Sequence, residues 1–220
     1  PIYIFIDSYG VDATIDYAGK CYGTHHHHIL ARNILSPHGN GLSLYAIDET
    51  GYCDWNVLEF CSFLNCERPV TSENFDAFHA RNNLYRRLIL TSSSPGSYLV
   101  ALFVGEPESV FEESIIVGVG GWTYPSGAAI TLGSGRGVTF RKCVIEGATG
   151  SPTGTNIKYT FTDNLMVRNV IPAEGSNRIV SGNTVYDGEV EFRGNWDGTI
   201  DATMAATLGG YEVGALKMAA

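Results

Sequence analysis

Charged residues are scarce in this sequence, and basic clusters and long apolar runs are missing from it. Only 17% of the 220 residues are charged, and the formal net charge at pH 7 is −9. Binding to nucleic acid needs clustered Lys and Arg that neutralise the phosphates. The apolar runs, such as Ser97 to Gly105, are much shorter than the roughly 20 residues of a membrane helix. We therefore expect neither nucleic-acid binding nor membrane insertion.

The cysteines follow no disulfide or zinc pattern. They are odd in number and have no CxxC spacing: Cys21, Cys53, Cys61, Cys66 and Cys143. We interpret them as mostly reduced and structural.

Two local motifs also lack the residues that would make them sites. The run His25 to His28 could offer imidazole ligands to a transition metal, but no carboxylate or Cys spacing follows it, so we predict solvated histidines. Gly133 to Gly137 lacks the partners of a phosphate-binding loop and is interpreted as a turn. We predict no metal site and no cofactor.

The sequence is rich in glycine and repeats itself. Its 26 glycines and 44% hydrophobic residues are typical of many short buried strands separated by turns. A recurring unit has apolar residues, two polar or basic residues, a small polar residue and two more apolar residues. The steps between matched positions are 26, 28, 27, 26, 29 and 26 residues, within the range of solenoid repeats. The matched positions are Asp7, Asn33, Cys61, Leu88, Ser114, Cys143 and Asn169.

A second series of alternating apolar segments lies between these copies. A unit of two or three such strands cannot bury its apolar face alone, whereas units stacked about 4.8 Å apart share a continuous core. The pattern therefore predicts an all-β fold, a parallel β-helix of about 7 coils of roughly 27 residues. The segments of the second series are 13–17, 42–46, 98–104, 129–132, 157–161 and 190–192, with 75–78 as a weaker member.

The small polar residue at the matched position has a predicted structural task. A turn between two strands leaves backbone groups inside the coil that need partners. An inward Asn offers both a donor and an acceptor, so Asn residues stacked from coil to coil can satisfy one another. Asn183 resembles such a corner but follows Asn169 by only 14 residues, which leaves the register beyond about residue 172 open.

The chain divides into a predicted β-helix domain, residues 1–198, and a C-terminal cap or tail, residues 199–220. The tail has weaker β character and better helix formers, and we expect it to cover the open end of the stack. Because the strand-like residues Ile2 to Ile6 follow Pro1 directly, we also expect a processed or excised piece of a longer protein.

The repeated unit resembles the pectin-lyase-like right-handed parallel β-helix superfamily, which includes polysaccharide lyases, polygalacturonases and phage tailspikes. The resemblance lies in strand, corner Asn and strand, as in Val167 to Ile171, preceded by a Gly-bounded strand such as Gly127 to Gly133. It implies a right-handed coil and glycan binding along the first sheet, although this fold hosts many functions. The polygalacturonase and alginate-epimerase signatures have only distant counterparts, in Thr162 to Asn164 and in Ser36 to Gly39.

Candidate site residues come from strand alternation and from aromatic residues in predicted loops. Glu189 and Glu191 would lie about 7 Å apart on the outer face of a strand, near the carboxylate separation of inverting glycosidases. A solvated charged strand face is the preferred interpretation of them. The remaining charged candidates on neighbouring coils are Lys158 and Arg193. The loop aromatics that could stack on sugars, or simply cover loop bases, are Trp55, Trp122, Tyr124 and Trp196.

Two functions fit these observations. The first is a structural β-helix protein of a virion or cell surface, extracellular, which presents loops to a glycan or a partner protein. By analogy with tailspikes it would be a homo-trimer or bind virion proteins. The second is a polysaccharide-degrading hydrolase or lyase, with Glu189 and Glu191 as catalytic residues and Lys158 and Arg193 as substrate-binding residues.

Overall fold

The protein is built from short β-strands. Within the described residues every regular element is a strand, and none of them forms a helix long and apolar enough to cross a membrane. A computed structural model describes residues 4–7, 13–18, 20–32, 40–45, 52–73, 79–92, 100–102, 108–117, 128–132, 137–146, 148–149, 159–167, 178–186, 190–192, 205–208, 211–214 and 216–218.

Most strands belong to four parallel sheets, of which two are long. The eight-stranded sheet contains, in order, β1 (Ile4–Asp7), β5 (Ile29–Arg32), β9 (Ser62–Cys66), β13 (Ile89–Ser92), β16 (Ile115–Val117), β19 (Val144–Glu146), β22 (Leu165–Val167) and β24 (Thr184–Tyr186). The seven-stranded sheet contains β4 (His25–His27), β8 (Val57–Glu59), β12 (Leu84–Arg86), β15 (Val110–Glu112), β18 (Thr139–Arg141), β21 (Tyr159–Thr162) and β23 (Arg178–Ser181).

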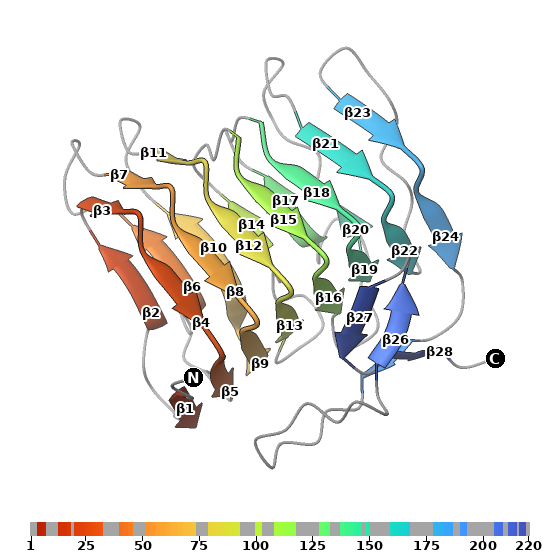
Figure 1. The fold of residues 1–220 in the computed structure, drawn as a ribbon, viewed down its shortest axis with the longest axis horizontal. Helices are drawn as coiled ribbons and strands as arrows, with labels where there is room; N and C mark the ends of the chain where they lie inside the picture. The colour runs from red at the N-terminus through yellow and green to blue at the C-terminus, as the bar shows by residue number, and fades with distance from the viewer. Residues whose placement is uncertain are drawn as a thin grey trace.

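Two smaller parallel sheets complete the coils. From β4 to β20 the chain visits the seven-, eight- and six-stranded sheets in turn and then begins again one strand further along each sheet (Figure 1). This all-β arrangement of stacked parallel sheets is consistent with the predicted β-helix. The six-stranded sheet contains β2 (Ala13–Ala18), β6 (Asn40–Tyr45), β10 (Arg68–Glu73), β14 (Val100–Leu102), β17 (Ala128–Leu132) and β20 (Ala148–Thr149). The three-stranded sheet contains β3 (Lys20–Tyr22), β7 (Tyr52–Asp54) and β11 (His79–Arg81).

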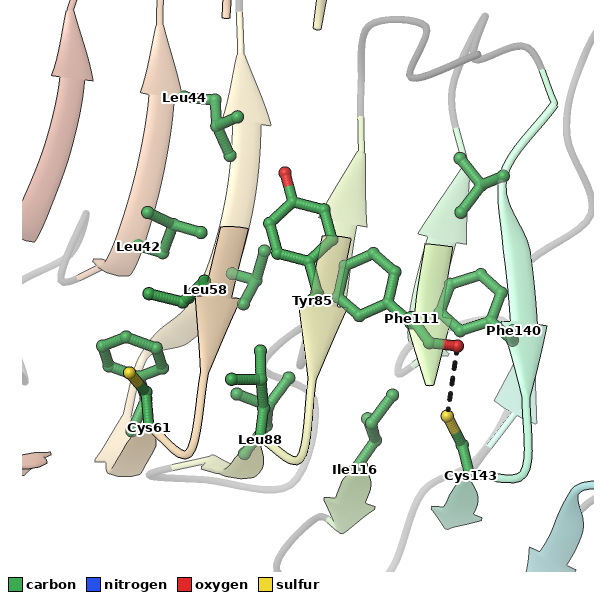
Figure 2. Close-up of a cluster of buried hydrophobic side chains, with 14 of the residues drawn as sticks. Leu42, Leu44, Leu58, Cys61, Tyr85, Leu88, Phe111, Ile116, Phe140 and Cys143 are labelled. Atoms are coloured by element: carbon green, nitrogen blue, oxygen red, sulfur yellow. Dashed lines mark hydrogen bonds between the residues drawn. The ribbon is translucent and has the colours of Figure 1, made fainter. Parts of the chain in front are cut away.

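The core is a column of side chains that the coils enclose. Aromatic rings stack between successive strands of the seven-stranded sheet: Tyr85 on Phe111 with ring centroids 4.3 Å apart, and Phe111 on Phe140 at 5.0 Å. Phe161 continues the stack at 5.1 Å from Phe140. These separations follow the spacing of adjacent strands, so each of these four coils adds one large ring to the core. Figure 2 shows Tyr85, Phe111 and Phe140 of this stack beside buried leucines and cysteines.

The corner between the seven- and eight-stranded sheets confirms the middle of the predicted column. Backbone hydrogen bonds link one corner to the next: Ile89 N donates to Cys61 O, and Ile115 N donates to Leu88 O. The steps of the column are 27, 26, 29, 21 and 19 residues, so the coils are shorter near the C-terminal end. The residues of the column are Cys61, Leu88, Ser114, Cys143, Asn164 and Asn183.

The predicted corner at Asn33 is wrong. Leu30 pairs with Ser62, so Ile29 occupies the corner position level with Cys61. Asn33 comes four residues later in the chain and lies outside the described residues. The prediction failed because the apolar residues of β5 resemble the flank of a corner as closely as the true one does.

The predicted corners at Asn169 and Asp7 are also wrong. Leu165 pairs with Val144, which puts the corner at Asn164, and Asn169 lies beyond β22, outside the described residues. Asp7 is the last residue of the paired strand β1. The prediction assumes a constant period of about 27 residues. Because this coil is shorter, the matched position falls beyond the true corner.

The predicted asparagine ladder exists, but at the turn by which the chain enters the seven-stranded sheet. Thr24 N donates to Asn56 Oδ1 at 3.0 Å, and Asn56 N donates to Asn83 Oδ1 at 2.9 Å. Asn83 N in turn donates to Ser109 Oγ at 3.1 Å. The ladder satisfies buried backbone groups of tight turns, which is the task that the argument from the sequence assigned to stacked asparagines.

A shorter asparagine ladder occupies the end of the corner column. Asn164 donates from its backbone N and from its Nδ2 to Asn183 Oδ1, each at 2.9 Å. Asn183 Nδ2 donates to Phe161 O at 2.8 Å. Asn183 is therefore a corner residue, and its register follows from Asn164 rather than from Asn169.

The second predicted series of strands is confirmed in part. Strands β2, β6, β14 and β17 coincide with it and belong to the six-stranded sheet, whereas 75–78 lies outside the described residues. The segment at 190–192 forms β25 (Val190–Phe192), which pairs antiparallel with β28 (Leu216–Met218). In the tail, β26 (Ala205–Leu208) pairs antiparallel with β27 (Tyr211–Gly214). Strand pairing thus outweighs the helix propensity of the tail.

Candidate functional site

Each coil presents two adjacent side chains together at the corner of the seven-stranded sheet. Neighbouring side chains of a regular strand point to opposite faces. Here the residue after the strand has a positive φ, which is 56° at His28, 53° at Phe60, 54° at Arg87 and 51° at Glu113. This left-handed backbone turns the second side chain to the same outer face as the first. The corner therefore carries two parallel rows of outward side chains.

The first row alternates acidic and basic residues in register. Arg86 Nε donates to Glu59 Oε2 at 3.1 Å, and Arg141 Nε donates to Glu112 Oε2 at 2.7 Å. Register pairing places Glu59, Arg86, Glu112 and Arg141 on successive strands. Each ion pair joins two neighbouring coils, although a partly exposed ion pair contributes only about 0.2–1 kcal/mol to the free energy of unfolding.

The second row combines aromatic and charged side chains. Arg87 Nε donates to Glu113 Oε2 at 2.8 Å, while the Arg87 guanidinium lies 5.1 Å from the centroid of the Phe60 ring. The His28 ring stacks on Phe60 with centroids 5.2 Å apart and an interplanar angle of 14°. A cation over an aromatic face is electrostatically favourable, so Arg87 fixes Phe60, and Phe60 in turn supports the imidazole of His28.

Arg86 and His25 hold the Glu59 carboxylate in its ionised form. Partial burial alone would raise its pKa, but hydrogen bonds from Arg86 and His25, together with their charges, outweigh burial and lower the pKa below the usual range. The same hydrogen bond from Arg86 raises the pKa of the guanidinium. Glu59 therefore serves as a fixed negative charge and is poorly suited to donate a proton near neutral pH.

His25, His26 and His27 form the edge strand β4 of the seven-stranded sheet, and His28 follows it. His25 Nε2 lies 2.9 Å from Glu59 Oε1, and His27 Nδ1 lies 2.8 Å from His28 Nδ1. His26 pairs in register with the buried Leu58, and burial lowers its pKa, as do the charges of His25 and His27. The predicted loop of histidines is thus an ordered strand whose imidazoles contact one another.

A shallow hollow of about 430 Å³ opens at the other end of the corner. A Cβ atom on Gly182 would lie 2.1 Å from Asp163 Oδ1, so the Asp163 carboxylate occupies the space above this glycine. A hollow of this volume is within the size range of small-ligand sites. It is lined by Lys142, Cys143, Asp163, Asn164, Leu165, Gly182 and Thr184.

The buried thiols are unsuited to nucleophilic chemistry. Burial raises the pKa of Cys61 to about 12 and that of Cys143 to about 12. The thiolate is the nucleophile, so thiols that stay protonated at neutral pH are unreactive. This agrees with their interpretation as structural residues.

Two of the predicted site residues fall within the described structure. Trp55 is exposed, has φ 60°, and follows β7 at the turn that carries Asn56. Glu191 lies in β25, where it pairs in register with Lys217. The predicted neighbouring coils are wrong for this strand, because β21 pairs with β18 and β23 and not with β25. The other predicted residues lie outside the described structure: Lys158, Glu189, Arg193, Trp122, Tyr124 and Trp196.

The two outward rows were missed by reasoning from the sequence. The signal was present, because Glu59, Arg86, Glu112 and Arg141 alternate in sign at steps of 27, 26 and 29 residues. These are the steps of the predicted repeat, but the charges were considered strand by strand. Charge alternation at the coil period would have placed them in one row.

Comparisons with known proteins do not identify this chain. No family model, curated protein or solved structure matches it. Among the residues that the structure describes, no group of three or more His, Cys, Asp or Glu side chains is arranged to hold a metal ion. The functional argument therefore depends on the geometry of the stack and its corner.

Proposed function

We propose that this protein is a structural right-handed parallel β-helix of about seven coils, pectin-lyase-like in architecture, that presents surfaces for glycan or partner recognition at a virion or cell surface. The observation that carries the proposal is the pairing of carboxylates with arginines of neighbouring coils. Asp54, Glu59, Glu112 and Glu113 each accept a hydrogen bond from an Arg side chain.

This pairing favours a scaffold over a catalyst. A general acid or base needs a pKa near the working pH, and such a pKa arises from burial or from neighbouring like charge. The pKa of Glu59 is instead lowered, away from neutral pH. Ion pairs between coils instead resist separation of the stack, which suits a rigid protein exposed to mechanical or proteolytic stress.

The hollow at Gly182 supplies a place for recognition. Asp163 and Thr184 line it, and hydroxyl and carboxylate groups can bond the hydroxyls of a sugar. Lys142 lines the same hollow and adds a cation that can contact an acidic sugar. The chemistry fits a single saccharide unit or a polar loop of a partner protein.

A combined binding and turnover assay tests the proposal. The folded protein is tested against a panel of neutral and acidic glycans, and the same glycans are assayed for new reducing ends and unsaturated uronates. We expect binding to a defined subset without turnover, and weaker binding by Asp163→Ala. Glu108→Ala, at an exposed position on a different turn, is the matched control and should bind normally.

Two results would overturn the proposal. Robust polysaccharide turnover that Glu191→Gln abolishes would establish the enzyme with Glu191 in the catalytic role. The absence of binding to both glycans and co-expressed surface proteins would remove the recognition role. A mass measurement on the same sample tests the homo-trimer that analogy with tailspikes suggests.

A further inference from the structure

His27 and His28, at the first corner, bring their ring nitrogens into contact, and the stacking of the coils does not require this contact. His27 ends β4, and His28 follows it with φ 56°. This backbone brings both imidazoles to the outer face, where the two Nδ1 atoms lie 2.8 Å apart. The rings meet nearly edge to face, at 87° with centroids 5.1 Å apart. Two ring nitrogens of the same type therefore lie in direct contact.

We propose that His27 and His28 chelate a divalent transition-metal ion of tetragonal geometry, Cu²⁺ above all. Metal–imidazole bonds are about 2.0 Å long, so two such bonds at a right angle place the nitrogens about 2.8 Å apart. A tetrahedral ion would require about 3.3 Å. The observed separation of 2.8 Å matches the first arrangement. For both Nδ1 atoms to bind the ion, the proton that one Nδ1 donates to the other moves to the Nε2 of its own ring, and water completes the coordination of the ion.

Neighbouring side chains hold the pair in this geometry. His28 stacks on Phe60 at 5.2 Å, and the Arg87 guanidinium lies 5.1 Å from the centroid of the Phe60 ring. Glu59 pairs in register with His27, and its charge favours a cation beside it. A site whose ligands are fixed by packing and hydrogen bonds binds its metal more tightly than a flexible run of histidines.

Copper binding to the folded protein tests the proposal directly. Equilibrium dialysis with Cu²⁺ alone, in a buffer that does not bind metals, measures the affinity, and electron paramagnetic resonance identifies the ligands. We expect one tight site with two equatorial nitrogens. His28→Phe copies Phe60 and His27→Thr copies Thr162, residues that occupy the same rows in other coils. Each variant should bind Cu²⁺ about tenfold or more weakly.

The matched control removes a histidine from the same run without touching the chelate. His26 pairs with Leu58 in register, so His26→Leu introduces a side chain that the structure already accommodates one coil further along. This variant should keep the affinity of the unchanged protein. Equal loss in His26→Leu, or equal affinity of the urea-unfolded chain, would show that the histidine run binds without the corner geometry and would overturn the proposal. Unchanged affinity in both His27→Thr and His28→Phe would overturn it as well.

Discussion

Asn56 lies directly against Asn83 of the next coil, with Asn56 Nδ2 donating to Asn83 Oδ1 at 3.1 Å and the Asn56 backbone N donating to the same oxygen at 2.9 Å. Asn83 Nδ2 donates to Cys53 O, in the same coil as Asn56, at 2.8 Å. The buried side-chain amide of Asn83 thus satisfies three polar groups of the preceding coil. Leaving such groups without partners costs more than the bonds contribute.

Truncation of that amide should loosen the stack. We expect Asn83→Ala to lower the free energy of unfolding by about 3 kcal/mol, because it leaves buried donors and an acceptor without partners. The free energy is measured by urea-induced unfolding. The control is Asn82→Gly at the preceding residue, which has φ 57° and tolerates glycine. Its effect should stay within about 0.5 kcal/mol. Equal effects of the two variants would contradict the ladder.

Gly41 should not accept a side chain. A Cβ atom there would lie 2.5 Å from Pro69 O and 2.6 Å from Phe63 Cγ, and the backbone oxygen is held in the sheet. We expect Gly41→Ala to destabilise the protein by about 2 kcal/mol or more, as overpacking does in cores. Gly23 has φ 64° and open space around it, so Gly23→Asn should be nearly neutral. Thermal unfolding of the two variants compares them, and a stable Gly41→Ala protein would refute the close packing of β6 and β10.

The stability that Glu59 contributes should depend on pH in one direction. Its pKa is lowered in the folded protein, whereas an unfolded Glu titrates near about 4.3. The contribution is therefore fully present above that pH and is lost as pH falls through the folded pKa. We expect Glu59→Gln to be less stable than the unchanged protein at pH 7, and the difference to shrink below about pH 4. A Glu59→Gln difference that grows in acid would contradict the assignment.

The buried thiols should react only when the stack opens. Burial raises the pKa of both Cys61 and Cys143 to about 12, so a thiol reagent at pH 8 should label them no faster than the protein unfolds. The half-buried Cys21 should react first. In urea all five cysteines should react. An unfolded thiol ionises near about 8.5, so this burial stabilises the fold below that pH and the benefit is lost as pH rises. Rapid labelling of Cys143 in the native protein would contradict its burial.

The sequence was sufficient to predict stacked parallel strands and the middle of the corner column. Cys61, Leu88, Ser114 and Cys143 lie where the repeat placed them, because the coils between them have nearly equal length. The same rule failed at Asn169, since the coil that begins at Cys143 is shorter. Contacts at the surface set the length of each loop, so a period derived from core residues does not predict which coil is shorter.

The candidate site depended on information that alternation in one strand does not contain. His27 and His28 share a face only because the backbone at His28 is left-handed, whereas regular alternation predicts opposite faces. The ion pair between Arg86 and Glu59 joins residues 27 positions apart, which becomes visible only when the register of the coils is known. Long-range register is thus the information that has to be added to the sequence.

The central claim is that each coil lies directly over the previous one, and amide-to-amide nuclear Overhauser effects test it without any mutation. In register, the amides of Leu58, Tyr85, Phe111 and Phe140 lie on successive parallel strands about 4.8 Å apart. We expect cross-peaks between successive members of this row and none between Leu58 and Phe111. Cross-peaks that skip a strand, or the absence of any link between residues 26 to 29 positions apart, would contradict the stacked architecture and the surface inferred from it.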